Sequence, residues 1–193
     1  MYKRQAEGKY AFTLATRGYY NIYNALAAIA IARIFGISYK DISRKLSGFH
    51  FPKSRMEIIK SGGITFIDDT YNANPVSLTQ ALEALEGMEV AGRKILVLGD
   101  MLELGEEKNK YHYQAGRHAA GVCDILVTVG KLSRLTGKGA REAGISRANI
   151  FSCRSSLEAK EVLSRRVSLE KNDVVLVKGS RLMRMEEVLK VSR

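Results

Sequence analysis

The residues best suited to chemistry lie together in one stretch, 68–75, with the sequence Asp-Asp-Thr-Tyr-Asn-Ala-Asn-Pro. The apolar run 64–67 before it predicts a buried strand, and the spacing of 76–85 after it predicts a helix. Turns that leave parallel strands lie at the carboxyl edge of an open sheet, where ligands bind. The stretch therefore predicts a polar ligand site. In the alternative interpretation, Asp69 or Asn74 only caps the following helix by accepting backbone N–H bonds.

Two further polar segments follow predicted strands in the same way. The segment 99–106 comes after the apolar run 94–98, and 178–181 comes after 173–177. If the three strands are neighbours, their loops form one crevice that holds carboxylates, amides, a lysine and an arginine. This mixture suits a zwitterionic or phosphorylated small molecule, and a divalent cation could accompany it because such cations favour carboxylate oxygens.

These two segments also have purely structural interpretations. Asp100 could serve a tight turn at Gly99, and Ser180 could cap the last helix. The tripeptide 178–180, Lys-Gly-Ser, is not a P-loop, because a P-loop needs two spaced glycines before its Lys-Ser/Thr pair.

Metal and thiol chemistry are not indicated. His50, His112 and His118 share no chelating spacing, so we expect no protein-bound metal. Cys123 and Cys153 are far apart and form no redox or metal pair, which favours two reduced, buried thiols. No Ser-His-Asp arrangement can be argued from sequence, so no catalytic residue is assigned.

The basic composition raises the question of whether the protein binds nucleic acid. The 193 residues carry a formal net charge of +11, with a pI near 9.7. The cations are scattered, and no zinc-finger or RNP-type pattern accompanies them, so we do not expect nucleic-acid binding. No apolar run approaches the roughly 18 residues of a membrane span. We expect a cytoplasmic protein. The alternative is a basic α/β binding module whose affinity for nucleic acid falls steeply with salt.

The predicted elements fall into two groups. Residues 1–49 contain an alternating strand at 10–16, an apolar helix at 21–35 that we expect to be buried on most sides, and a second helix at 38–46; they look like the end of something larger. From residue 50 onward a hairpin and then alternating strands and helices predict a doubly wound, mostly parallel α/β sheet. The strands are expected at 56–59, 64–67, 94–98, 124–129, 149–152 and 173–177. The helices are expected at 76–86, 109–120, 131–143, from Ser155 or Ser156 to Arg166, and 182–191.

Several motifs together resemble those of the Mur ligase family. Gly18-x-x-Asn21-x-x-Asn24 looks like the end of the family's ATPase domain. The others follow in the family's order: Ser54-Arg55-Met56-Glu57, then the segments 68–75, 99–105 and 178–181. The resemblance implies that 1–49 is the C-terminal remnant of a central ATP-binding domain. It implies that 50–193 is the Rossmann-like C-terminal domain that binds the amino acid or dipeptide.

The resemblance also implies an activity. Family members are ATP-dependent ligases of peptidoglycan synthesis, and the motifs are most similar to those that add D-alanyl-D-alanine to UDP-N-acetylmuramoyl-tripeptide through an acyl phosphate. ATP and Mg²⁺ would be the cofactors, these two substrates would be the partners, and the full-length protein would be a cytoplasmic monomer without a membrane span.

Residue roles are implied by motif position. Asn24 would contact adenine with Asn21 beside it, Arg55 would reach the nucleotide, and Asp69 would hold the ribose. The implied nucleotide-binding residues are Asn21, Asn24, Arg55, Asp69, Tyr71 and Asn72. The implied substrate-binding residues are Asn74, Asp100, Glu103, Lys178, Ser180 and Arg181.

Two departures from the family pattern matter. Tyr20 stands where the family usually has His, and a phenol cannot act as an imidazole. No Gly-x-x-x-x-Gly-Lys-Ser/Thr loop occurs in the sequence, and the UDP-binding first domain has no counterpart. We therefore expect a C-terminal fragment that is inactive alone. The rival interpretation is another Mur ligase or a folylpolyglutamate synthase-type amide ligase, which a comparison of dipeptide and glutamate as amine acceptors would distinguish.

Overall fold

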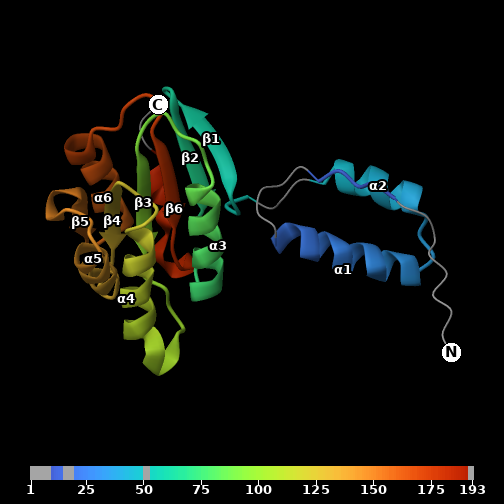
Figure 1. Cartoon of the computed structure of the whole chain (residues 1–193), viewed down its shortest axis with the longest axis horizontal. Coiled ribbons are helices and arrows are strands. Elements are labelled where there is room, and N and C mark those ends of the chain that lie inside the picture. Colours follow the sequence, from blue (N-terminus) through green and yellow to red (C-terminus); the bar gives the residue numbers. More distant parts are fainter. Residues whose placement is uncertain (1–9, 15–19, 50–52, 191–193) are drawn as a thin grey trace. The chain divides into compact units, whose positions relative to one another are not determined.

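The computed structural model describes residues 10–14, 20–49 and 53–190 (Figure 1). The chain divides into two compact units, Met1–Phe51 and Pro52–Arg193, and each is described here by itself. The predicted boundary after residue 49 lies close to this division. The assignment of the two parts to an ATP-binding and an amino-acid-binding domain stays a prediction.

The second unit is built on a six-stranded sheet with the order β1-β2-β6-β3-β4-β5. Strand β1 pairs with β2 in antiparallel register, and every other pairing is parallel. The predicted doubly wound, mostly parallel sheet is therefore confirmed. The strands are β1 (Glu57–Ser61), β2 (Ile64–Asp69), β3 (Lys94–Gly99), β4 (Ile125–Val129), β5 (Ile150–Cys153) and β6 (Val174–Lys178).

The antiparallel pair is a hairpin closed by two glycines. Gly62 and Gly63 have φ angles of 59° and 81°, and Ser61 faces Ile64 across the turn. Two successive positive φ angles match the twist of a two-residue hairpin, and glycine adopts them without steric cost. The predicted hairpin is confirmed.

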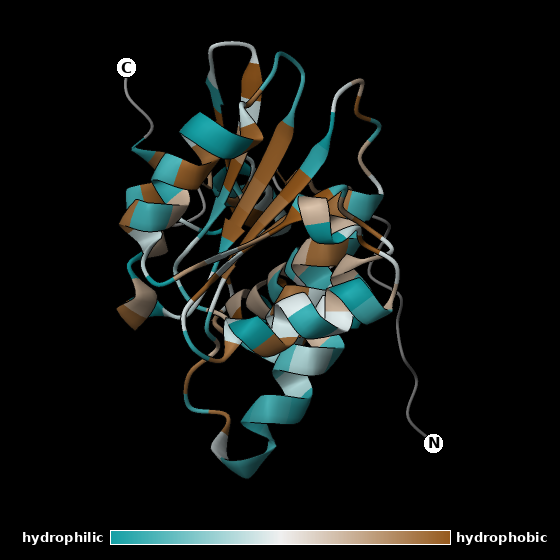
Figure 2. Cartoon of the chain, turned by 90° about the vertical axis from the view of Figure 1, so that its left-hand side faces the viewer, coloured by the Kyte–Doolittle hydropathy of each residue, from teal (hydrophilic) through white to brown (hydrophobic). Residues whose placement is uncertain are grey.

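Both faces of the sheet are buried by helices, which explains why its strands are continuously apolar (Figures 1 and 2). Along β3, Leu96 and Leu98 pack on one side, while Ile95 and Val97 pack on the other. The covering helices are α3 (Pro75–Glu86), α4 (Lys108–Ala119), α5 (Ser133–Glu142) and α6 (Ser156–Val162), and a π-helical turn, Leu163–Val167, continues α6. Cys123 and Cys153 are free and buried, as expected, and burial raises the pKa of the Cys123 thiol to about 12.

The end of this unit corrects a prediction. Instead of one helix over 182–191, two 3-10 turns form at Arg181–Met183 and Met185–Leu189, separated by Arg184 with a φ of 49°. Residue 191 lies outside the described residues. The interruption accompanies the complete burial of Met185, whose side chain occupies space 2.7 Å from where a Cβ on Gly99 or Gly179 would lie.

The first unit contains α1 (Tyr20–Ile34) and α2 (Tyr39–Ser47). The strand predicted at 10–16 is wrong for residues 10–14, which are irregular, and 15–16 lie outside the described residues. A strand needs a neighbouring strand to bond its backbone, and the described remainder of this unit is helical or irregular. The expectation that α1 is buried on most sides is also wrong in this chain, because Ile31 and Ile34 are 56% and 82% exposed.

No helix in the described part of the chain is long and apolar enough to cross a bilayer.

Candidate functional site

The three polar segments that follow β2, β3 and β6 meet at the carboxyl edge of the sheet. In the sheet order, β6 lies between β2 and β3 and runs parallel to both. The condition set by the sequence, that these strands be neighbours, is therefore met. Hydrogen bonds join the segment 178–181 both to 68–75 and to 99–106.

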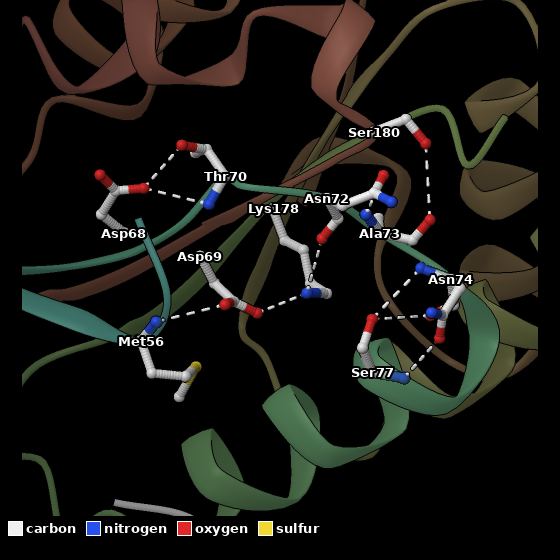
Figure 3. A network of polar contacts seen from close by, with 10 residues as sticks. All are labelled: Met56, Asp68, Asp69, Thr70, Asn72, Ala73, Asn74, Ser77, Lys178 and Ser180. Atoms are coloured by element: carbon white, nitrogen blue, oxygen red, sulfur yellow. Dashed lines mark hydrogen bonds and ion pairs between the residues drawn. The ribbon is translucent and has the colours of Figure 1, made fainter. Parts of the chain in front are cut away.

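A buried ion pair joins the ends of β2 and β6. Asp69 and Lys178 are register partners, and the Lys178 Nζ lies 2.5 Å from Asp69 Oδ2. The same Nζ donates to the carbonyl of Asn72 at 3.0 Å (Figure 3). The side chains of Lys178 and Asp69 are 2% and 12% exposed, so each charge depends on the other for compensation. Asp69 does not cap α3, so that alternative is wrong for this residue.

Asp68 projects from the opposite face of β2, because successive strand residues alternate. Its Oδ1 accepts from the backbone N–H and the hydroxyl of Thr70, at 3.0 and 2.7 Å. Its Oδ2 accepts from the Ser54 hydroxyl at 3.0 Å. Asp68 therefore fixes both the start of the 68–75 turn and a segment that precedes β1.

The two asparagines of the turn hold its backbone. Asn72 Oδ1 accepts from Ala73 N at 2.9 Å. Asn74 is the N-cap of α3, where its Oδ1 accepts from Ser77 N at 2.8 Å and the Ser77 hydroxyl accepts from Asn74 N at 3.2 Å (Figure 3). The capping interpretation of Asn74 is thus confirmed, and a role in substrate binding stays a prediction.

Ser180 connects all three segments. Its hydroxyl accepts from Leu102 N at 2.8 Å and donates to the Ala73 carbonyl at 3.4 Å, and its own N–H donates to the Asp100 carbonyl at 3.0 Å. It makes no side-chain cap at the turn that follows, so the capping alternative is wrong. At 4% exposure, Ser180 holds the three loops in one arrangement.

Asp100 binds the neighbouring loop that leads into α5. Its Oδ2 accepts from the N–H groups of Lys131 and Leu132 at 3.0 and 3.2 Å, and its Oδ1 accepts from the N–H and hydroxyl of Ser133, both at 2.6 Å. A carboxylate at a helix N-terminus satisfies N–H groups that lack intrahelical partners. This role replaces the tight turn at Gly99 that we considered, and a contact from Asp100 to substrate stays a prediction.

His112 is a residue that sequence reasoning missed. It is completely buried, its Nε2 accepts from Met101 N at 2.9 Å, and its Nδ1 lies 2.6 Å from the Lys108 carbonyl. Because that carbonyl only accepts, Nδ1 carries the proton and the ring is neutral. The sequence offers one signal, a histidine six residues beyond the polar segment 99–106, which was interpreted only as a possible metal ligand.

Arg55 and Tyr71 form an exposed cation–π stack. The Arg55 guanidinium carbon lies 4.0 Å from the centroid of the Tyr71 ring, and Tyr71 is 50% exposed. A guanidinium over an aromatic face is a favourable cation–π pair. Two residues that the family resemblance had assigned to the nucleotide are thereby brought together.

The remaining predicted residues are less tightly held. Glu103 is exposed with a φ of 62°, and Arg181 is 61% exposed with Glu186 at 3.4 Å. In the first unit, Asn24 Nδ2 donates to Asn21 Oδ1 at 3.3 Å. Tyr20 begins α1, and its side chain lies outside what the structure describes.

The comparisons with known proteins establish the family. The family model "Mur ligase, glutamate ligase domain" matches residues 54–181, which is more than half of the 193-residue chain. The chain belongs to the Mur ligase family. The family predicted from the motifs is therefore confirmed.

Relatives named UDP-N-acetylmuramoyl-tripeptide–D-alanyl-D-alanine ligase match most of the chain. One from Bacillus subtilis (strain 168) is 36% identical over 183 residues, which are 93% of this chain and 39% of that relative. A crystal structure of MurF from Acinetobacter baumannii superposes with a TM-score of 0.81 at 32% identity, over 92% of this chain and 38% of that chain. The MurF ligase from Thermotoga maritima, solved in complex with ADP, gives 0.71 at 26% identity, over 91% and 38%. The chain thus spans about two fifths of the length of these relatives.

Proposed function

We propose that this chain is the C-terminal part of a UDP-N-acetylmuramoyl-tripeptide–D-alanyl-D-alanine ligase that works in the cytoplasm. The observation that carries the proposal is the meeting of three motif-bearing loops at one edge of the sheet. Relatives with that name match the chain over most of its length, which supports the choice among family activities. The sheet edge then forms one wall of a site for ATP and for the amine substrate.

The nucleotide side of this wall is the Arg55–Tyr71 stack together with Asp69. The stack offers an exposed flat surface suited to a nucleobase. Asp69 Oδ1 and Oδ2 each have one donor, Met56 N and Lys178 Nζ, so each oxygen keeps capacity for a ribose hydroxyl. Lys178 and Met56 hold the carboxylate in place before a nucleotide arrives, which limits the ordering cost of binding.

The amine side lies toward Ser180 and Arg181. The Arg181 guanidinium is 61% exposed, and its nearest carboxylate, that of Glu186, is 3.4 Å away. A guanidinium is the side chain best suited to bind a carboxylate in two-pronged fashion. We assign it the C-terminal carboxylate of D-alanyl-D-alanine, with Ser180 fixing the backbone from which it extends.

The side chains at this edge of the sheet do not by themselves form a site for a magnesium ion. Among the described residues no group of three His, Cys, Asp or Glu side chains could hold a metal. We therefore derive no step through Mg²⁺ from these residues.

The contribution of these residues is alignment. In the proposed reaction the tripeptide carboxylate is phosphorylated by ATP, the dipeptide amine attacks the acyl phosphate, and ADP and phosphate leave. Fixing the dipeptide by its far carboxylate orients the amine, and fixing the ribose sets the position of the phosphates, so both reactants lose their freedom of motion before the reaction.

A chimera tests the proposal, because the chain covers about two fifths of its relatives. Residues of the Bacillus subtilis relative that match this chain are replaced by it, and dipeptide-dependent release of phosphate is measured. In chimeras that circular dichroism shows to be folded, Asp69→Ala should raise the KM for ATP about tenfold or more, as expected when a hydrogen bond to a charged group is lost. Asp124→Ala is the matched control, because this carboxylate holds Lys94 N at the opposite edge of the sheet. An unchanged KM in Asp69→Ala would contradict the assigned role.

A further inference from the structure

The segment 54–56 has an unusual backbone. Ser54 and Met56 have φ angles of 61° and 55°, so two non-glycine residues out of three are left-handed. Residues other than glycine avoid this region for steric reasons, and such strain persists only where the surroundings impose it. The segment follows closely on the division between the compact units at Phe51 and Pro52.

Four hydrogen bonds impose this conformation. Ser54 N donates to Glu57 Oε2 at 3.1 Å, and the Ser54 hydroxyl donates to Asp68 Oδ2 at 3.0 Å. Tyr71 N donates to the Ser54 carbonyl at 3.0 Å, and Met56 N donates to Asp69 Oδ1 at 3.2 Å. Every polar group of Ser54 is thus engaged, and the bonds reach both β1 and the 68–75 turn.

In each of the two carboxylates at the end of β2, one oxygen bonds within the sheet edge and the other bonds the segment 54–56. Asp68 directs Oδ1 to Thr70, and Asp69 directs Oδ2 to Lys178, so each is anchored within the sheet edge. The other oxygen of each holds the segment 54–56, and the Met56 bond to Asp69 is drawn in Figure 3. As whole residues, Asp68 and Asp69 are 6% and 9% exposed, so these anchored residues do not follow the segment if it moves.

We propose that residues 54–56 form a strained latch that Asp68 and Asp69 hold closed and that opens as one unit. Arg55 lies between the two left-handed residues and stacks on Tyr71, which itself donates its N–H to Ser54. Opening relaxes both strained residues to ordinary backbone angles and removes Arg55 from the Tyr71 ring. The latch thereby sets whether the exposed stack is formed. The latch is independent of which ligand the stack binds.

The test is hydrogen exchange and trypsin cleavage on the 193-residue chain. Ser54→Ala removes only the hydroxyl bond to Asp68 and leaves the Met56 bond to Asp69 in place. If the segment opens as one unit, exchange of the Met56 amide and cleavage after Arg55 should both rise by about tenfold or more, the effect of losing a hydrogen bond to a charged group. Ser54→Gly removes the same bond but relieves the strain, so its increase should be smaller.

Ser146→Ala is the matched control. The Ser146 hydroxyl accepts from Ala148 N at 3.3 Å in another exposed turn, and Arg147 provides a trypsin site there. Its effect should stay at that turn, and Ser54→Ala should leave the Arg147 site unchanged.

The latch is supported if the Met56 amide and the Arg55 site respond together in Ser54→Ala while the Arg147 site does not. It is overturned if the Met56 amide exchanges as in the wild type, since the segment would then not act as one unit. It is also overturned if all trypsin sites open together, which would indicate global destabilisation, or if Ser54→Gly and Ser54→Ala behave identically, which would show that no strain is stored.

Discussion

Removing the charge of Lys178 should destabilise the second unit strongly. Lys178→Met keeps the length of the apolar stem but leaves the Asp69 carboxylate, 12% exposed, without its cation. Breaking one partner of a buried pair costs about 3–5 kcal/mol. We expect the lower end, about 3 kcal/mol, because Asp69 keeps the bond from Met56 N and some contact with water. In urea this corresponds to a midpoint lower by about 1.5 M.

The double variant separates charge pairing from packing. Asp69→Asn combined with Lys178→Met removes both charges, so its loss should be smaller than the sum of the two single losses by about 2 kcal/mol or more. Urea unfolding of the 193-residue chain followed by far-UV circular dichroism measures all four proteins. A loss below about 1 kcal/mol for Lys178→Met, or strictly additive single losses, would refute the reasoning that the two side chains compensate each other.

Two further predictions concern the sheet. Burial would raise the pKa of Asp173, but the bonds from Arg93 and from backbone N–H groups hold the pKa below its ordinary 3.8. The ionised carboxylate therefore stabilises the fold above pH 3.8. This contribution is lost as the pH falls through the lowered pKa. The stability difference between the wild type and Arg93→Met, from urea unfolding at several pH values, should therefore shrink below pH 3.8, and a difference that grows there would contradict this. Gly130→Ala should lower the free energy of unfolding by about 2 kcal/mol or more beyond the loss in Gly144→Ala. Both glycines have strongly positive φ, but a Cβ at Gly130 would lie 2.4 Å from the Asp100 carboxyl group, whereas one at Gly144 would meet no atom within 4 Å. Equal losses in thermal unfolding would contradict the clash.

Most of the sheet could be predicted from the sequence because its strands are buried on both faces. The apolar runs at 95–98 and 174–177 favour central strands of a covered sheet, and each predicted strand after residue 50 lies within a few residues of the observed one. The polar exits 68–75, 99–106 and 178–181 were likewise visible, because side-chain hydrogen-bonding groups concentrate there.

The partners of the site residues could not be predicted, because they depend on which strands are neighbours. Asp100 reaches residues 131–133 only because β3 lies beside β4, and Ser180 reaches Leu102 only because β6 lies beside β3. Local spacing contains no such information, so both residues were first interpreted from nearby turns and helices.

The local errors have a related cause. Helical spacing at 182–191 did not show that burying Met185 accompanies a left-handed Arg184. The alternation at 10–16 did not show whether a neighbouring strand exists, and residues 10–14 are irregular. In both places the outcome depends on what the segment packs against, which a pattern within the segment cannot express.

The acceptor preference of the chimera tests the central claim most directly. The Bacillus subtilis relative with its matching part replaced by this chain is supplied with ATP and UDP-N-acetylmuramoyl-tripeptide, and phosphate release is compared for D-alanyl-D-alanine and L-glutamate. We predict rapid release with the dipeptide and none above background with glutamate. A folded chimera that prefers glutamate, or that uses neither acceptor, would contradict the proposal that this chain completes a D-alanyl-D-alanine ligase.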